Sequence, residues 1–380
     1  MFGFFAPRYV NEARELLKSA RKLVDYKRDL WSEVTLADFE VQMKNLRDAA
    51  ARRDERAVAE EAKRLDDMAG AFSPPAKDAG WRENCEVFLV AIIVALGVRT
   101  YFLQPFTIPT GSMQPTLNGI IGHPTKEPPP NVVSRIAQTF LLGRSYLDVV
   151  CETDGVITPQ IDEQGNKVPM KEIKRFGFFT YTRIDCGGHT YLVHAPVETL
   201  GRYFHIDFDR EYHMGDVIAR GYVDTGDHVF VDKMSYNFRA PERGKVFVFN
   251  TKNIQTSENM TNPEGPSQYY IKRLAGLPND TLRIESPNLY INGKIADAFG
   301  FKRVMAAKDG YRGYGQGPNY GNLSEPDSVF SVPPKCYFAL GDNSYNSADS
   351  RYWGIVPQQN IMGYGLLVYW PFNSHWGLIK

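Results

Sequence analysis

The chain has 380 residues, with 44 basic and 44 acidic side chains, 21 Tyr and 23 Phe. This length allows two or three domains, and the balanced charge argues against a global field of the kind that attracts nucleic acid. The four cysteines are Cys85, Cys151, Cys186 and Cys336. They include no C-x-x-C pair, which argues against a disulfide framework or a zinc site and leaves one bridge open.

Residues 1–80 form a charged region for which we predict two helices. Apolar residues recur at three- and four-residue spacing within Tyr9–Trp31, and Leu36–Met68 is rich in Ala, Glu, Lys and Arg. Ser73-Pro74-Pro75 is a strong stop and linker signal. The start, Met1–Val10, lacks a signal-peptide pattern because its apolar piece is short and no small-residue cleavage site follows. We expect a solvated cytoplasmic region without a catalytic role.

Residues 84–103 are predicted to form one transmembrane helix. Val87–Val98 contains no polar side chain, but a full span needs roughly 20 mostly apolar residues, so a buried core helix is an alternative. Arg99 would extend its charge to the outer headgroups, with Tyr101 and Phe102 as interfacial aromatic residues. We expect the N-terminus inside and the body outside, because a long domain translocates regardless of the flanking charges.

Gln104–Leu117 contains a serine at the centre of a Pro-rich segment. Its three prolines exclude a helix and favour extended backbone, and Gly111 allows a tight turn just before Ser112. This geometry predicts Ser112 on a fixed, exposed corner close to a membrane surface. Such a serine is either a nucleophile or part of a turn without chemistry.

Residues 118–225 are predicted to be a β-rich insertion of unknown role. Short alternating runs such as Gly177–Thr182 and Thr190–His194 follow a Pro-rich loop at Pro124–Pro130. Five of the seven histidines lie here, and none has the spacing of a metal-ligand motif. We expect no metal and no cofactor.

Strand patterns resume at residues 226–380, in His228–Lys233, Lys245–Phe249 and a run that begins at Tyr269. Because side chains alternate across a strand, Lys272 and Arg273 lie on opposite faces, and one of the two must point towards whatever the strand covers. If Lys272 does so, desolvation lowers its pKa from about 10.4, as a lysine base requires. The alternative is a solvated lysine on an edge strand.

Gly341–Gly354 is a dense polar segment that contains Ser347, Asp349 and Arg351. So many short polar side chains indicate a loop held by its own hydrogen bonds. Asp349 and Arg351 would form a charge-assisted pair, and Ser347 would orient an amine.

Taken together, three motifs resemble those of the bacterial type I signal peptidases, which are membrane-anchored endopeptidases with a Ser-Lys dyad. The motifs are Ile108–Leu117, Tyr270–Pro278 and Gly341–Gly354, in the order of the family. The resemblance covers the apolar segment up to Leu117 and the chain from Gly226 onwards. It implies a mainly β catalytic body, formed by residues 104–117 and 226–380, with an N-terminal helical region and one transmembrane helix.

The resemblance also implies a role for each matching residue. Ser112 would be the nucleophile and Lys272 the general base. Ser347 would hydrogen-bond the lysine amine, and the Thr110 hydroxyl would join the Ser112 backbone N–H in the oxyanion hole. Asp349 and Arg351 would support the loop that carries Ser347.

The implied function is cleavage of N-terminal signal peptides from exported preproteins after small residues, as in Ala-x-Ala. The implied location is the bacterial plasma (inner) membrane, with a single pass and the catalytic domain on the outer, periplasmic face. Secretory preproteins and membrane lipid are the expected partners, contact with the export machinery is left open, and no nucleic acid is expected. The alternative from another class is a catalytically inactive, membrane-anchored preprotein-binding protein. A soluble self-cleaving Ser-Lys repressor is the nearest enzymatic rival, but it would need a DNA-binding segment and no span.

Overall fold

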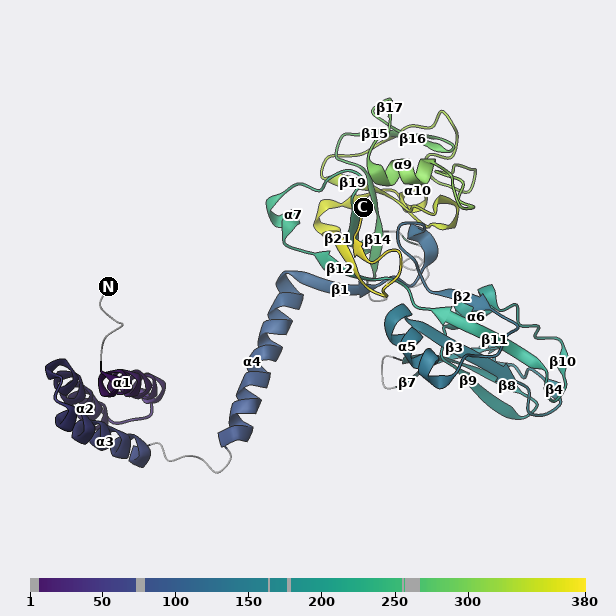
Figure 1. The fold of residues 1–380 in the computed structure, drawn as a ribbon. Coiled ribbons are helices and arrows are strands. Elements are labelled where there is room, and N and C mark those ends of the chain that lie inside the picture. Colours follow the sequence, from purple (N-terminus) through teal and green to yellow (C-terminus); the bar gives the residue numbers. More distant parts are fainter. Residues whose placement is uncertain (1–6, 73–78, 163–164, 176–178, 255, 257–266) are drawn as a thin grey trace. The chain divides into compact units, whose positions relative to one another are not determined.

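The computed structural model describes residues 7–72, 79–162, 165–175, 179–254, 256 and 267–380 (Figure 1). The chain divides into two compact units, Met1–Ile93 and Val94–Lys380. The linker signal Ser73-Pro74-Pro75, the first six residues and the start of the run Gly177–Thr182 lie outside the described residues. The mainly β body, the N-terminal helices and one apolar helix confirm the predicted fold class.

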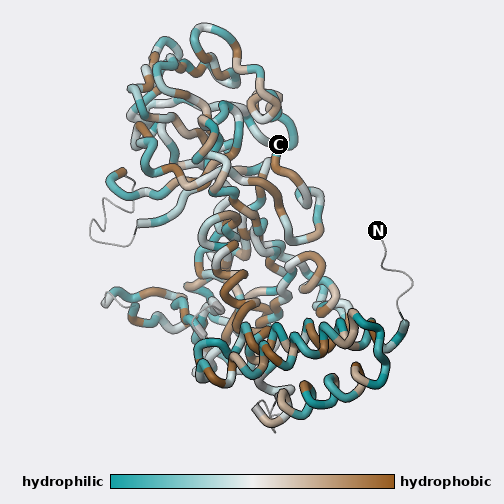
Figure 2. Tube along the Cα trace, turned by 90° about the vertical axis from the view of Figure 1, so that its left-hand side faces the viewer, coloured by the Kyte–Doolittle hydropathy of each residue, from teal (hydrophilic) through white to brown (hydrophobic). Residues whose placement is uncertain are grey.

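The N-terminal unit begins with three helices, α1 (Arg8–Lys27), α2 (Glu33–Arg52) and α3 (Glu55–Phe72). The prediction of a single helix over Leu36–Met68 is wrong. Arg53 adopts a left-handed conformation with φ of 56°, and the Asp54 carboxylate accepts a hydrogen bond from the Ala57 N–H at 3.1 Å. This reversal lets residues of all three helices share one core. Figure 2 shows these helices as mostly hydrophilic, with hydrophobic residues recurring along them.

Helix α4 spans Ala79–Tyr101, and its apolar side chains from Val87 to Val98 are largely exposed. Within it, Glu83–Tyr101 has a mean hydropathy of 1.6 and is long and apolar enough to cross a membrane by length and composition. No other helix among the described residues meets this criterion. The helix ends two residues before the predicted limit of 103, because the chain turns at Phe102 and enters the first strand.

An antiparallel sheet forms the body of the second unit, in the order β1-β12-β21-β13-β14-β19-β20, with β22 paired to β21. Its strands are β1 (Leu103–Thr107), β12 (His228–Asp232), β13 (Val246–Asn250), β14 (Tyr269–Gly276), β19 (Cys336–Leu340), β20 (Val356–Pro357), β21 (Ile361–Trp370) and β22 (Gly377–Leu378). The strand predictions for His228–Lys233, Lys245–Phe249 and the run from Tyr269 are confirmed by β12, β13 and β14.

A smaller sheet, in the order β17-β16-β15-β18, lies between β14 and β19 in sequence. Its strands are β15 (Thr281–Glu285), β16 (Asn288–Ile291), β17 (Lys294–Ile295) and β18 (Phe330–Ser331), and the helix α9 (Phe299–Met305) lies between β17 and β18 in the chain. Short elements complete the body: α7 (Ser235–Phe238), α10 (Ser350–Trp353) and the 3-10 turns η1 (Gly111–Met113), η2 (Ser344–Asn346) and η3 (Gln358–Asn360).

Residues 118–225 contain two three-stranded sheets, β2-β11-β3 and β7-β8-β9, and a hydrophobic core of their own. The strands are β2 (Ile121–Pro124), β3 (Arg144–Val150), β4 (Gly155–Val156), β5 (Gln160–Ile161), β6 (Lys167–Val168), β7 (Lys171–Arg175), β8 (Phe179–Cys186), β9 (His189–Val193), β10 (Glu211–Tyr212) and β11 (Val217–Asp224). The helices are α5 (Val132–Leu142) and α6 (Val197–Tyr203).

Candidate active site

Ser112 lies in the turn η1, which is separated from β1 by three residues. Met113 is fully buried in the core below the turn. The Ser112 carbonyl oxygen accepts a hydrogen bond from the Asn343 backbone N–H at 3.0 Å, and the Gly111 carbonyl accepts one from Asn343 Nδ2 at 3.1 Å. The expected exposed corner is wrong, since Ser112 is only 7% exposed. The polar loop that follows β19 therefore fixes the position of the Ser112 turn through these two hydrogen bonds.

Lys272 lies in β14, which is paired with β13 on one side and with β19 on the other. Its Nζ donates a hydrogen bond to Ser112 Oγ at 2.8 Å, and the residue is only 6% exposed. A solvated lysine on an edge strand is therefore excluded. Lys272 and Arg273 are both buried, so each face of the strand covers one cation.

Arg273 forms a buried ion pair that the sequence patterns did not predict. Its guanidinium donates to both carboxylate oxygens of Asp342, at 2.8 and 2.6 Å, to Thr116 Oγ1 at 3.0 Å and to the Gly244 carbonyl at 2.6 Å. Burial would lower the pKa of Arg273, but the charge of Asp342 and its hydrogen bonds raise it above the ordinary value. The sequence contained one signal for this ion pair, namely the second cation directly after Lys272 and the acidic Asp342 in the polar loop.

Gly300 makes room for this pair. A Cβ at residue 300 would lie 2.0 Å from a terminal nitrogen of Arg273, so no larger residue fits without displacing the guanidinium. Helix α9 thereby packs directly against the ion pair, which joins β14, the polar loop and the residues that follow Ser112.

The polar loop is held by Asp349 and Arg351, which are both fully buried. The Asp349 carboxylate accepts from the Arg351 guanidinium at 2.8 Å at each oxygen and from the Gly341 N–H at 2.9 Å. Arg351 also donates to the hydroxyl and the carbonyl of Ser344, at 2.7 and 2.6 Å, and to the Gly315 carbonyl at 2.9 Å. Burial opposes the charge of Arg351, but Asp349 raises its pKa. The expected charge-assisted pair is present.

Ser347 does not make the expected contact. Its hydroxyl is buried and has no hydrogen-bond partner among the described residues, so the predicted bond to the Lys272 amine is not formed there. The hydroxyl instead packs over Gly341, where a Cβ would lie 2.0 Å from Ser347 Oγ and 2.8 Å from the Ser112 carbonyl oxygen. The backbone of the polar loop packs closely against the Ser112 turn at Gly341, and this packing fixes the position of the Ser347 hydroxyl.

Thr110 immediately precedes the turn and is exposed. Its hydroxyl lies 3.4 Å from Ser112 Oγ. This is long for a hydrogen bond between hydroxyl groups, but it places a donor beside the serine oxygen, on the open side of the site.

A cleft of about 270 Å³ lies over Ser112 and Lys272. One side is formed by the segment Ile108–Ser112 and another by Gln268–Lys272. The insertion contributes Glu198 and Arg202 of α6, which pair with each other at 2.8 Å. No local pattern in the sequence places these two residues at the cleft, because the contact depends on how the insertion folds back on the body.

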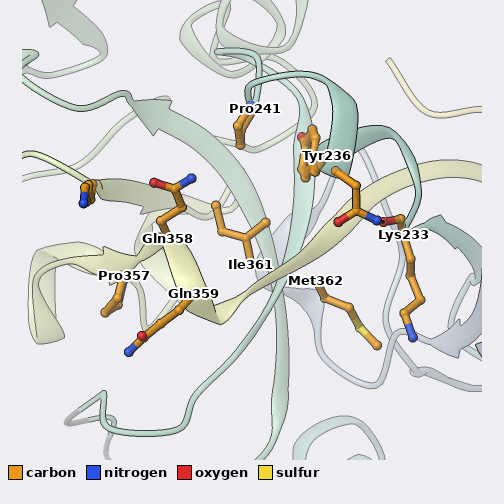
Figure 3. A pocket seen from close by; sticks show the side chains of 10 residues that line it. Lys233, Tyr236, Pro241, Pro357, Gln358, Gln359, Ile361 and Met362 are labelled. Carbon is orange, nitrogen blue, oxygen red and sulfur yellow. Dashed lines mark hydrogen bonds between the residues drawn. The ribbon is translucent and has the colours of Figure 1, made fainter. Parts of the chain in front are cut away.

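A larger cavity of about 670 Å³ is lined by other residues, among them Lys233, Tyr236, Gln358 and Met362 (Figure 3). Ser112 and Lys272 do not line this cavity. The larger of the two cavities is therefore not the one that contains the hydrogen-bonded serine and lysine. Among the described residues, no group of three or more His, Cys, Asp or Glu side chains is arranged to hold a metal ion.

Comparison with known proteins places the chain in a family. Residues 220–370 match the family described as signal peptidase, peptidase S26. A signal peptidase I of Bacillus caldolyticus is 31% identical over 40% of this chain and 74% of its own length. The chain belongs to the signal peptidase S26 family. The matched region contains Lys272, Ser347, Asp349 and Arg351, whereas Thr110 and Ser112 precede it.

Other relatives in the signal peptidase S26 family match over a smaller part of their length. A probable signal peptidase I-2 of Synechocystis is 35% identical over 39% of this chain and 57% of its own length. A signal peptidase I of Leptolyngbya laminosa is 32% identical over 40% and 64%. The chain thus spans less than two thirds of these two relatives. A crystal structure of a signal peptidase I from Enterococcus faecalis also matches, with 27% sequence identity and a TM-score of 0.25. The match covers 33% of this chain and 97% of the chain in that structure.

Proposed function

We propose that this member of the family is a membrane-bound serine endopeptidase that removes N-terminal signal peptides from exported preproteins. Ser112 is the nucleophile and Lys272 its general base. The observation that carries the proposal is the 2.8 Å hydrogen bond between two buried side chains at a cleft. This contact meets the geometric requirement for a nucleophile activated by an adjacent base.

The reaction begins with the neutral amine of Lys272, which accepts the proton of the Ser112 hydroxyl as Oγ attacks the scissile carbonyl. The Ser112 backbone N–H and the Thr110 hydroxyl stabilise the oxyanion of the tetrahedral intermediate. The Lys272 ammonium then gives its proton to the leaving amine, which is the new N-terminus of the exported protein, and an ester to Ser112 remains. Water, deprotonated by Lys272, hydrolyses this ester and releases the signal peptide.

The substrate binds as an extended segment along the cleft. Strand β1 lies at the edge of the sheet, and the segment Gln104–Pro109, which contains most of β1 and the two residues after it, offers an edge for backbone pairing. Alternate side chains of the peptide then enter shallow pockets that admit only small residues, as in Ala-x-Ala. The pair Asp349–Arg351 and the pair Arg273–Asp342 hold the loop and strand that position Ser112 and Lys272.

In this function, helix α4 spans the bacterial plasma (inner) membrane once. Its length and apolar composition support this assignment. The N-terminal helices then lie in the cytoplasm, and the catalytic body lies on the outer face, where exported preproteins emerge. Membrane lipid and the export machinery are further proposed partners of the protein.

Cleavage of a preprotein with an Ala-x-Ala site by the detergent-solubilised full chain tests the proposal. We expect activity in the parent and its loss in Ser112→Ala and in Lys272→Ala. Equal activity in all three would place the chemistry elsewhere. A folded parent that binds several preproteins and cleaves none would instead support the inactive binding protein.

A further inference from the structure

Two cysteines meet in the core of the insertion. Cys151 directly follows β3 and Cys186 ends β8, so their contact joins the two three-stranded sheets of this region. Their Sγ atoms lie 3.5 Å apart, and the residues are 2% and 0% exposed. The other two cysteines differ, since Cys85 is exposed on α4 and Cys336 is half-buried in β19.

The backbone on both sides of this contact is held in place. The Cys151 N–H donates to the Asp216 carbonyl, and the Cys151 carbonyl accepts from the Gly215 N–H, both at 2.8 Å. Cys186 pairs with His189 across the hairpin. A disulfide needs about 2.05 Å between the sulfur atoms, so closure requires them to approach by roughly 1.5 Å.

We propose that Cys151 and Cys186 form a disulfide in the mature protein. The inference rests on the proposed location of the catalytic body outside the plasma membrane, since disulfides persist in such oxidising compartments. The oxidant is a reactive disulfide of a thiol–disulfide exchange partner. The thiolate of one cysteine attacks that disulfide and forms a mixed disulfide, and the second cysteine resolves it. The two cysteines lose two protons and two electrons, and the partner disulfide becomes two thiols.

The bridge forms while the insertion folds. Burial is the main cause that raises the pKa of the Cys186 thiol to about 11 in the folded, reduced protein, and the hydrogen bond with Cys151 is a smaller one. The reactive thiolate is therefore scarce once the core has closed, and solvent no longer reaches the sulfur atoms. For the same reason the completed bridge resists reduction in the folded state.

The disulfide stabilises a region that reaches the cleft. The core that contains both cysteines also contains Leu200 of α6, and this helix carries Glu198 and Arg202 at the cleft over Ser112. Cross-linking the two sheets reduces the conformational freedom of the unfolded insertion. It therefore favours the state in which α6 is correctly placed beside the substrate.

A thiol count on the full chain tests the inference. The protein is isolated from membranes of its own host, denatured in the presence of N-ethylmaleimide so that every free thiol reacts, freed of excess reagent, and treated with a second, mass-tagged maleimide after reduction. In the variant Cys85→Ala/Cys336→Ala, we expect no N-ethylmaleimide adduct and two tags after reduction. Two adducts before reduction would overturn the disulfide.

The control variant Cys151→Ala/Cys186→Ala should show adducts and no reduction-dependent tags. We also expect reductant to lower the melting temperature of the parent by several degrees and to leave that of the control unchanged. Preprotein cleavage is measured on the same samples. An active protein with two free thiols contradicts only the disulfide, whereas a bridged protein without activity contradicts only the peptidase.

Discussion

Arg273 and Asp342 form a fully buried ion pair that is joined by two hydrogen bonds. Arg273 follows Lys272 in the sequence, and Asp342 precedes Asn343, whose backbone N–H donates to the Ser112 carbonyl. The hydrogen bonds of Arg273 join β14 to Asp342 in the polar loop, to Thr116 and to Gly244. The pair is therefore a positioning element, and its effect on activity passes through the strand and the loop.

Asp342→Ala should strongly destabilise the protein. It leaves the Arg273 guanidinium buried without its counter-charge, which typically costs about 3–5 kcal/mol. Denaturant unfolding of the parent and the variant measures the change. The matched control is Glu285→Ala, which removes the partner of Arg283 in a half-exposed pair at 3.0 Å. Exposed pairs contribute about 0–1 kcal/mol, so an equal loss in both variants would contradict the prediction.

Thr110→Val should reduce turnover and preserve the fold. Valine matches the shape of threonine but removes the hydroxyl that lies 3.4 Å from Ser112 Oγ. The loss of one oxyanion donor typically lowers turnover by a factor of about 10² to 10³. Thr110→Ser keeps the donor and should stay close to the parent. Cleavage by the valine variant at the parental rate would exclude Thr110 from the oxyanion hole.

Ser347→Ala separates stability from catalysis. Because the hydroxyl is buried without a partner among the described residues, its removal should leave the free energy of unfolding unchanged or slightly higher. If the hydroxyl contacts the Lys272 amine only when substrate is bound, turnover should fall at constant stability. Unchanged turnover would show that Ser347 does not orient the lysine. The role of Ser347 would then be limited to its packing against Gly341.

Activity should rise with pH. Lys272 is only 6% exposed, and burial disfavours the charged ammonium relative to the neutral amine. Only the neutral amine accepts the serine proton, so kcat/KM increases as pH rises and the ammonium loses its proton, and it is constant once the amine is neutral. A pH–rate profile of the parent measures the pKa of the free enzyme. A rate that is independent of pH from mildly acidic to strongly alkaline conditions would argue against Lys272 as the base.

Local sequence patterns determined many of the secondary-structure elements of this protein. Alternation of apolar residues marks strands such as β12 and β13, and the uninterrupted apolar run marks α4, because these periodicities arise within each segment. The short polar residues of Gly341–Gly354 similarly indicated a loop tied by its own hydrogen bonds. The pair Asp349–Arg351 was predictable because its members lie two residues apart.

Tertiary structure alone decided the contacts between distant segments. Ser112 and Lys272 are 160 residues apart, and they meet because β14 runs through the sheet beneath the turn after β1. Which strands become neighbours also decides the burial of Arg273 and the contact of Cys151 with Cys186. It likewise leaves the Ser347 hydroxyl without a hydrogen-bond partner among the described residues. Strand order depends on packing of the whole chain, so no periodicity within a segment carries this information.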